Sequence, residues 1–380
     1  MSTQKPSLTV LLSQIEDPRH SRTQIHDLGE ILTISACSML CGGESFNDME
    51  YFGTVREAWL RTFLKLTHGI PSHDTFNRVF SMINPARFME VFVAWTNTLR
   101  SVLDRDIVAI DGKALRRASK KGSRIPQVVS AWSRDNGICL GQIQVDEKSN
   151  EITAVPLLLR QLDLAGCIVT LDAMGCQKKI AKEIHESDAD YVLALKGNQE
   201  TVHDEVKTFL DEEIRLHLDP ERKTPSSLLV FETIEKDHGR HEIRRYYLST
   251  KTHWFQDRDQ WENLQCFGMV ESIRTVTGEA PSTERRYYLG SIPADAELFA
   301  KAVRGHWSVE NQLHWCLDVL FREDLSRARS GHASQNLATL RRLSLNLLKR
   351  STKKCSLRQK RLNAAWDYDY LKELMTQKID

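Results

Sequence analysis

The sequence predicts an α/β protein whose core is a mixed five-stranded sheet with helices, preceded by a helical region and interrupted by a β-rich insertion. Three observations predict this organisation. Apolar residues recur at helical spacing over the first hundred residues, short apolar runs alternate with amphipathic helices over 106–198, and four further strand patterns lie within 199–292. A chain of 380 residues is too long for one ordinary core and is expected to contain about two or three domains.

The composition is that of a globular protein that stays outside membranes. Hydrophobic residues make up 41% of the chain and charged residues 27%, which is typical of soluble domains. The longest apolar stretch, 31–41, contains three hydroxyl side chains and is much shorter than the roughly 20 residues that span a bilayer. The N-terminus lacks the basic start and apolar run of a secretory signal. We therefore expect a cytoplasmic protein.

The eight cysteines form no recognisable framework. No two of them are arranged as Cys-x-x-Cys, and most lie within apolar runs such as 167–171. Cysteines used as small core residues in a reduced compartment explain this pattern better than a disulfide framework or a zinc site.

The N-terminal region contains recognisable helix starts. Ser45 is a good N-cap for a helix over 45–64, and a turn at 69–71 precedes a shorter helix that is capped by Ser72 and carries Arg78. A turn followed by a short basic helix is compatible with a helix-turn-helix that contacts DNA. A small helical bundle that packs on the core is the alternative, and the sequence does not separate the two.

Residues 106–198 alternate strands and helices in an order that matches a known fold. Three strands come first, the second and third joined by a strong hairpin signal at 134–137, and a helix, a strand, a helix and a strand follow. This is the order of the ribonuclease-H-like fold, in which the first and fourth strands are neighbours. Asp111 and Asp172 are therefore expected at the ends of two neighbouring strands. The strands are expected at 106–113, 126–133, 139–145, 167–175 and 190–198, and the helices at 151–162 and 177–187.

These two aspartates belong to a set of carboxylates suited to holding metal ions. Three carboxylates on a rigid scaffold suffice to hold two Mg²⁺ or Mn²⁺ ions about 4 Å apart, which is the arrangement that phosphodiester cleavage and transfer require. Asp111 is the expected bridging ligand and Asp172 the second. The third must follow the β-rich insertion, and the best candidate is Glu310, on a helical pattern that begins at Asp295.

Glu310 lies one helical turn from both His306 and His314, on the same side of the expected helix. The spacing His-x-x-x-Glu-x-x-x-His leaves zinc as an alternative, although zinc hydrolases use His-Glu-x-x-His on a single helix. We expect Glu310 to complete the carboxylate set, with the two histidines at its rim, placed to touch DNA phosphate.

Basic residues are clustered, although the net charge is only +1. Residues 341–361 contain nine Lys or Arg and no acid, and a second cluster spans 116–124, shortly after Asp111. A basic run is usually a solvated face, but two of them beside a carboxylate set favour a nucleic-acid partner. The candidate DNA contacts are Lys113, Arg116, Arg117, Lys196, Arg304, His306, His314, Arg341 and Arg342.

Six stretches of the sequence carry a resemblance to a known family. They are HGIPSHDTFNRV (68–79), IDGKALR (110–116), VTLDAMGCQ (169–177), DYVLALKGNQ (190–199), HGRHEIRR (238–245) and RGHWSVENQLHWCLDVLFRED (304–324). Together they are very specific. The chain resembles the H-repeat-associated proteins, a branch of the insertion-sequence DDE transposases, over nearly its whole length, from Asp17 to about Arg342.

The resemblance implies a DDE recombinase core with a catalytic triad of Asp111, Asp172 and Glu310, and two Mg²⁺ or Mn²⁺ ions as cofactors. It implies a transposase that binds double-stranded DNA at the ends of its element, cleaves it and joins it to target DNA, with a homodimer on the DNA as the expected assembly and association with the nucleoid through that DNA. The alternative is a catalytically inactive or domesticated DNA-binding relative.

The chain departs from the pattern of related transposases on the helix that carries the glutamate. Related transposases carry a pattern of Tyr, Arg, Glu and Lys on the glutamate helix. In this chain only the glutamate fits, because the positions of the Tyr, Arg and Lys hold Val303, His306 and Leu317.

The expected domains are a transposase-associated, DNA-binding helical domain at 1–100, the first part of the catalytic core at 101–198, the insertion at 199–292, the core helix at 293–340 and a basic C-terminal segment at 341–380.

Overall fold

The chain forms two compact units in the computed structural model. Unit 1 comprises Met1–Val102, Gly112–Asn150 and Glu310–Asp380, and unit 2 comprises Leu103–Asp111 and Glu151–Val309. Within the described residues, no helix combines the length and the apolar character that crossing a membrane requires. The structure describes residues 8–101, 103, 105–119, 125–145, 150–221, 226–237, 240–276, 278 and 280–376.

The first hundred residues of unit 1 form helices whose starts follow from their capping residues. The Ser45 hydroxyl accepts a hydrogen bond from the backbone N–H of Asp48, whose carboxylate accepts one from the N–H of Ser45. The Ser72 hydroxyl caps the helix that begins at His73 by accepting a hydrogen bond from the backbone N–H of Thr75. Such caps satisfy donors that the first helical turn leaves unpaired, and both predicted N-caps are confirmed. The helices are α1 (Leu8–Leu12), α2 (Leu28–Leu40), α3 (Phe46–Val55), α4 (Glu57–Leu60), α5 (His73–Met82) and α6 (Pro85–Leu99).

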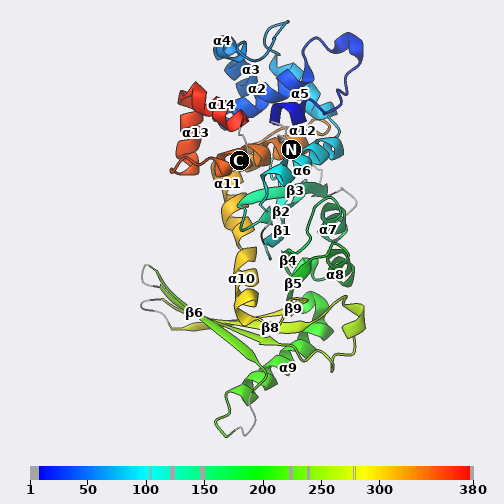
Figure 1. Ribbon diagram of the computed structural model, residues 1–380, viewed down its shortest axis with the longest axis vertical. Coiled ribbons are helices and arrows are strands. Elements are labelled where there is room, and N and C mark those ends of the chain that lie inside the picture. The colour runs from blue at the N-terminus through cyan, green and yellow to red at the C-terminus, as the bar shows by residue number, and fades with distance from the viewer. Residues whose placement is uncertain are drawn as a thin grey trace, which may run out of the picture. The chain divides into compact units, whose positions relative to one another are not determined.

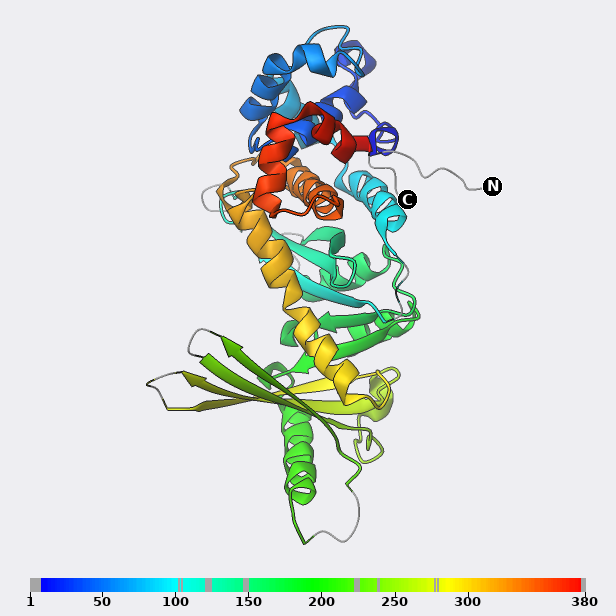
Figure 2. The same ribbon diagram turned by 60° about the vertical axis from the view of Figure 1, so that its left-hand side comes forward.

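The central helix of unit 1 is α12 (Ala333–Arg350), in which 14 of 18 residues are buried. It packs against α2, α5, α6 and a hairpin of two strands, β2 (Gln127–Ser133) and β3 (Ile138–Val145) (Figures 1 and 2). The hairpin confirms the turn predicted at 134–137. The basic segment that was expected to begin at residue 341 begins inside this buried helix. The remaining C-terminal helices are α11 (Trp315–Val319), α13 (Leu357–Trp366) and α14 (Tyr368–Thr376).

Unit 2 is built on a sheet with a parallel centre and an antiparallel extension. β1 (Ile107–Ala114), whose residues up to Asp111 belong to this unit, pairs parallel with β4 (Ile168–Leu171), and β4 pairs parallel with β5 (Asp190–Leu195). Antiparallel pairing continues from β5 through four more strands. These are β9 (Ser282–Gly290), β8 (Cys266–Val276), β7 (Arg240–Ser249) and β6 (Leu229–Asp237). The helices are α7 (Glu151–Leu159), α8 (Lys178–His185), α9 (Glu200–His217) and α10 (Ala296–His306).

The strands of the insertion extend the core sheet and do not form a sheet of their own. The strand order is β3-β2-β1-β4-β5-β9-β8-β7-β6, a mixed sheet of nine strands, where five strands were expected for the core. Without β9, the edge of β5 would present unpaired N–H and C=O groups, and β9 pairs with them. The four strand patterns predicted within 199–292 are all strands in the structure.

Helix α10 is fixed to the extended sheet by aromatic packing. Its Phe299 is buried in a core cluster that includes Tyr246 and Tyr288. Gly268 on β8 allows this approach, because a Cβ at that position would lie 2.3 Å from Phe299 Cζ. The glycine therefore sets how closely the helix that leads to Glu310 packs on the sheet.

Gly268→Ala is expected to lower the free energy of unfolding by about 1–3 kcal/mol, because the added methyl group displaces the Phe299 ring from its packed position. Urea unfolding followed by circular dichroism measures this change. Gly197→Ala is the control, because nothing lies within 4 Å of a Cβ built there. Equal stability of the two variants would contradict the close packing of α10 on β8.

All eight cysteines are free thiols, six of them buried and two half-buried. Burial raises the pKa of Cys176 to about 12 and the pKa of Cys139 to about 11. Protonated, buried thiols are inert as nucleophiles and as metal ligands. The expectation that the cysteines serve as small core residues is confirmed for the six buried ones.

Candidate metal centre

Asp111 lies within β1 and Asp172 directly follows β4, and these two strands are neighbours in the sheet. The parallel register pairs Ile110 with Leu171, an offset of 61 residues (171 − 110). Asp111 and Asp172 have the same offset (172 − 111 = 61), so they come directly after the last registered pair of the two strands. Neighbouring strands lie about 4.8 Å apart. The prediction that the first and fourth strands are neighbours is confirmed.

The carboxylate of Asp172 is oriented by the turn that follows β4. Its Oδ1 accepts hydrogen bonds from the backbone N–H groups of Met174 and Gly175, at 3.0 and 3.2 Å. The Asp172 side chain is exposed, whereas Asp111 is half-buried. Backbone donors on one oxygen fix the direction of a carboxylate.

The C-terminal end of α10 contacts β4. His306 Nδ1 lies 3.1 Å from the hydroxyl oxygen of Thr170, which precedes Asp172 by two residues. Beyond His306 the chain continues as helix and changes to a π-helical turn at Glu310–His314. Turns of this kind are rare and occur frequently at functional sites.

Glu310 and His314 form a hydrogen-bonded pair within this turn. Glu310 Oε2 lies 3.0 Å from His314 Nδ1, and Glu310 is exposed whereas His314 is only 4% exposed. Burial lowers the pKa of His314, the hydrogen bond that Glu310 accepts opposes that change in part, and the charge of Arg342 adds to it. The imidazole is therefore neutral near pH 7, which is the form that binds metal ions.

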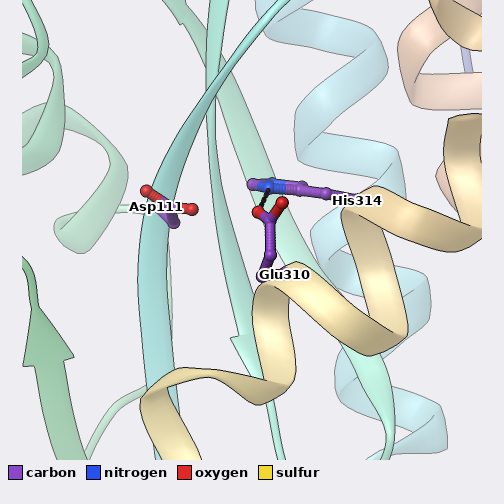
Figure 3. Close-up of side chains that lie close together, drawn as sticks. All are labelled: Asp111, Glu310 and His314. Atoms are coloured by element: carbon purple, nitrogen blue, oxygen red, sulfur yellow. Dashed lines mark hydrogen bonds and ion pairs between the residues drawn. The ribbon is translucent and has the colours of Figure 1, made fainter. Parts of the chain in front are cut away.

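Figure 3 shows Asp111, Glu310 and His314 close together. One ligand atom from each side chain lies within 4.8 Å of the others, a spacing that suits a shared metal ion. Within the part of the chain that the structure describes, this is the one group of three or more His, Cys, Asp or Glu side chains with that spacing. A zinc site of the spacing His-x-x-x-Glu-x-x-x-His would combine Glu310 and His314 with His306. The observed group combines them with Asp111 instead. Asp172 is outside the group.

Two family models match this chain. The model described as Transposase DDE domain matches residues 103–347, and the model described as DDE_Tnp_1-associated matches residues 10–96. The chain belongs to the DDE transposase family.

Individual DDE transposase relatives match along most of the chain. The chain is 37% identical over 375 residues to "Putative transposase YncI" of Escherichia coli O157:H7, which covers 97% of this chain and 94% of the relative. It is 38% identical over 372 residues to "H repeat-associated putative transposase YhhI" of Escherichia coli K12, which covers 96% of each. "H repeat-associated putative transposase YbfD" of the same strain is 40% identical over 235 residues, or 61% of this chain and 90% of the relative. The resemblance to H-repeat-associated proteins is confirmed.

Four side chains that were expected to contact DNA in this DDE transposase lie inside unit 1. Lys113 is 8% exposed, His314 4%, Arg341 1% and Arg342 0%. Carboxylates explain the burial of two of these cations, because Lys113 Nζ lies 2.8 Å from an oxygen of Asp318 and Arg342 Nη1 lies 2.9 Å from Glu323 Oε1. The burial of these four side chains argues against the expected phosphate contact.

The other candidate DNA contacts remain accessible. Arg117 and Lys196 are exposed, and Lys196 directly follows β5, the strand beside β4. Arg116 and Arg304 are also exposed, although each has a carboxylate neighbour, Asp324 at 3.3 Å and Glu235 at 3.2 Å respectively. His306 is half-buried in its contact with Thr170.

A second basic feature of this DDE transposase was missed in the sequence. Arg322, Arg327 and Arg329 line a cavity of about 610 Å³ in unit 1, together with Asn77 of α5 and residues 44–48 at the start of α3. The three arginines lie within eight residues, but they fall outside both of the basic runs that were singled out. His314 was also missed as a member of the group with Asp111 and Glu310, because a helical pattern alone does not show which side of the helix is buried.

Proposed function

We propose that this chain is the transposase of an insertion-sequence-type element, which binds element-end DNA and catalyses metal-dependent strand cleavage and transfer. The observation that carries the proposal is the group of Asp111, Glu310 and His314, with Asp172 following the neighbouring parallel strand. Membership of the DDE transposase family supports the same reaction. We assign the catalytic roles to Asp111, Asp172 and Glu310.

We propose a ribonuclease-H-like core for this reaction. The order β3-β2-β1-β4-β5, with β1, β4 and β5 parallel and β2 and β3 antiparallel, supports it. In this proposal the four strands from β6 to β9 are the insertion that separates Glu310 from the two aspartates. The helices before β1, which the DDE_Tnp_1-associated model matches, are the proposed N-terminal DNA-binding domain.

The residues at the site fit divalent metal ions. Carboxylate oxygens are the ligands that Mg²⁺ and Mn²⁺ prefer, and a neutral imidazole is compatible with Mn²⁺. Two bound ions would supply Lewis-acid chemistry at the scissile phosphate. Asp111, Asp172 and Glu310 would hold them. His314 would orient the Glu310 carboxylate through Nδ1, because groups hydrogen-bonded to a ligand fix its direction and tune its basicity.

The exposed basic side chains are the proposed contacts to double-stranded DNA. Arg116, Arg117, Lys196 and Arg304 would pair with phosphates, which sets affinity and register without reading sequence. Both element ends and target DNA are proposed substrates, with a homodimer as the assembly on DNA.

The proposal is tested by incubating the purified protein with labelled duplexes that contain the inverted repeats flanking its gene. We expect cleavage at the repeat ends in Mg²⁺ or Mn²⁺ and none in EDTA. A matched duplex with scrambled ends is the control for sequence-independent nuclease activity. Specific binding of the end duplex without cleavage in either metal would contradict the proposal and would support the inactive, DNA-binding alternative.

A further inference from the structure

A buried ion-pair network begins two residues after Asp111. Lys113 Nζ lies 2.8 Å from Asp318 Oδ1, 2.8 Å from Asp324 Oδ1 and 3.6 Å from Glu323 Oε2. The Lys113 side chain is 7% exposed and the Glu323 side chain is fully buried. A single ammonium group is therefore surrounded by three carboxylates inside unit 1.

The network continues to the central helix of unit 1. Glu323 Oε1 accepts a hydrogen bond from Arg342 Nη1 at 2.9 Å, with both side chains fully buried. Arg342 Nε also lies 3.2 Å from the hydroxyl of Ser130 on β2. The network thus connects β1 and β2 to the segment 318–324 and to α12, across about 210 residues of sequence.

Two of these parts lead directly to proposed metal ligands. Asp111 and Lys113 are two residues apart on β1, so their side chains point to the same face of the strand. Asp318 and Asp324 follow Glu310 by 8 and 14 residues (318 − 310 and 324 − 310), through the π-helical turn and α11. Lys113 therefore joins the strand end that carries one ligand to the segment that carries another.

Stability alone does not explain a charged residue at position 113. A buried ion pair is costly to desolvate, and well-packed apolar side chains of similar volume are often as stabilising. Ion pairs differ from apolar contacts in fixing the relative position of their partners, because their energy depends on particular atoms being in contact. A DNA contact is excluded as the reason by the burial of Lys113.

We propose that Lys113 is a positioning residue, which holds the end of β1 and the segment after Glu310 in the arrangement that metal binding requires. The inference rests on the proposed function, since it assumes that Asp111 and Glu310 are ligands. It assigns Lys113 no contact with DNA or with the reacting phosphate. Its effect reaches the reaction only through the spacing of the ligands.

The test compares Lys113→Met and Lys113→Arg with the parent. We expect Lys113→Met to raise the Kd for Mn²⁺, measured by electron paramagnetic resonance, by roughly tenfold or more, as for other groups that orient metal ligands. The kcat for cleavage of end DNA should fall while the KM for DNA is unchanged. Lys113→Arg keeps the charge and should recover most of the Mn²⁺ affinity.

Arg244→Met is the matched control. Arg244 is also a buried cation (8% exposed) paired with two carboxylates, Glu235 and Glu242, but it lies on β7, five strand positions from β1. The Arg244→Met variant should be less stable than the parent and should bind Mn²⁺ with the same Kd. Asp324→Asn removes one partner of Lys113 at a partly exposed position, and it provides a second variant should Lys113→Met fail to fold.

If the Kd of Lys113→Met for Mn²⁺ equals that of the parent, the positioning role is overturned and the proposed function stays intact. If Lys113→Met is unfolded, an unchanged Kd in Asp324→Asn overturns the positioning role instead. An equal rise of the Kd in Arg244→Met would also overturn it, because general destabilisation would then be the cause. Absence of Mn²⁺ binding by the parent would overturn the metal assignment itself, and the positioning role with it.

Discussion

Replacing Asp111 by asparagine is expected to abolish strand cleavage in Mg²⁺ and to leave the affinity for end DNA nearly unchanged. The substitution removes the negative charge of a proposed ligand but keeps the shape of the side chain. A rate lowered on the order of 1,000-fold or more corresponds to about 4 kcal/mol of lost transition-state stabilisation. Asp172→Asn is expected to behave in the same way, because both aspartates come directly after the last registered pair of two parallel strands, Ile110 and Leu171.

Cleavage of labelled end DNA and fluorescence anisotropy, measured on the same preparations, separate the two effects. Asp204→Asn is the matched control, since Asp204 is an exposed carboxylate on α9 of unit 2 and belongs to no ligand group. Parental cleavage by either Asp111→Asn or Asp172→Asn would remove that aspartate from the proposed triad. Parallel losses of cleavage and DNA affinity would point to a folding defect.

Glu323→Gln is expected to lower the free energy of unfolding by about 3–5 kcal/mol, because it leaves Arg342 buried with an uncompensated charge. Arg341, which is also buried and close enough to Glu323 for their charges to interact, adds to the cost. Chemical unfolding in urea at neutral pH measures the change. Glu212→Gln, at an exposed ion pair with Arg215, should leave the unfolding midpoint unchanged.

The same carboxylate gives the prediction a pH dependence. Burial by itself would raise the pKa of Glu323, but the charges of Arg342, Arg341 and Lys113 outweigh it, so the pKa is lowered. A carboxyl group with a lowered pKa in the folded state stabilises the protein above the pKa of the unfolded chain, and this contribution is lost as the pH falls through the folded pKa. The difference in stability between the parent and Glu323→Gln should therefore shrink in acid. A constant difference would contradict the assignment.

Local patterns were sufficient to predict the elements that carry the two aspartates. The strand that contains Asp111, the strand ending just before Asp172 and the hairpin at 134–137 each depend on a few adjacent residues. The helix caps at Ser45 and Ser72 are equally local. The order of the elements then predicted that the first and fourth strands are neighbours, because few topologies accommodate it.

Long-range contacts could not be predicted in this way. Arg341 and Arg342 belong to a run of cations without acids, which is the pattern of a solvated surface. The partner that makes the burial of Arg342 tolerable is Glu323, 19 residues earlier in the sequence, and Lys113 reaches Asp324 across 211 residues. The pairing of β9 with β5, which joins β6, β7, β8 and β9 to the other strands of the sheet, is likewise set by contacts between distant segments.

The division of unit 1 into three stretches of chain has a consequence for biosynthesis. Its last stretch begins at Glu310, and 159 residues (151–309) separate it from the second. At roughly 5–20 residues per second, a ribosome needs about 8–32 s to cross that interval. During it, α2, α5 and α6 expose to solvent the surfaces that α12 later covers. Glu310 and His314 belong to this last stretch, so the group that they form with Asp111 can assemble only after residues 310–314 have been synthesised.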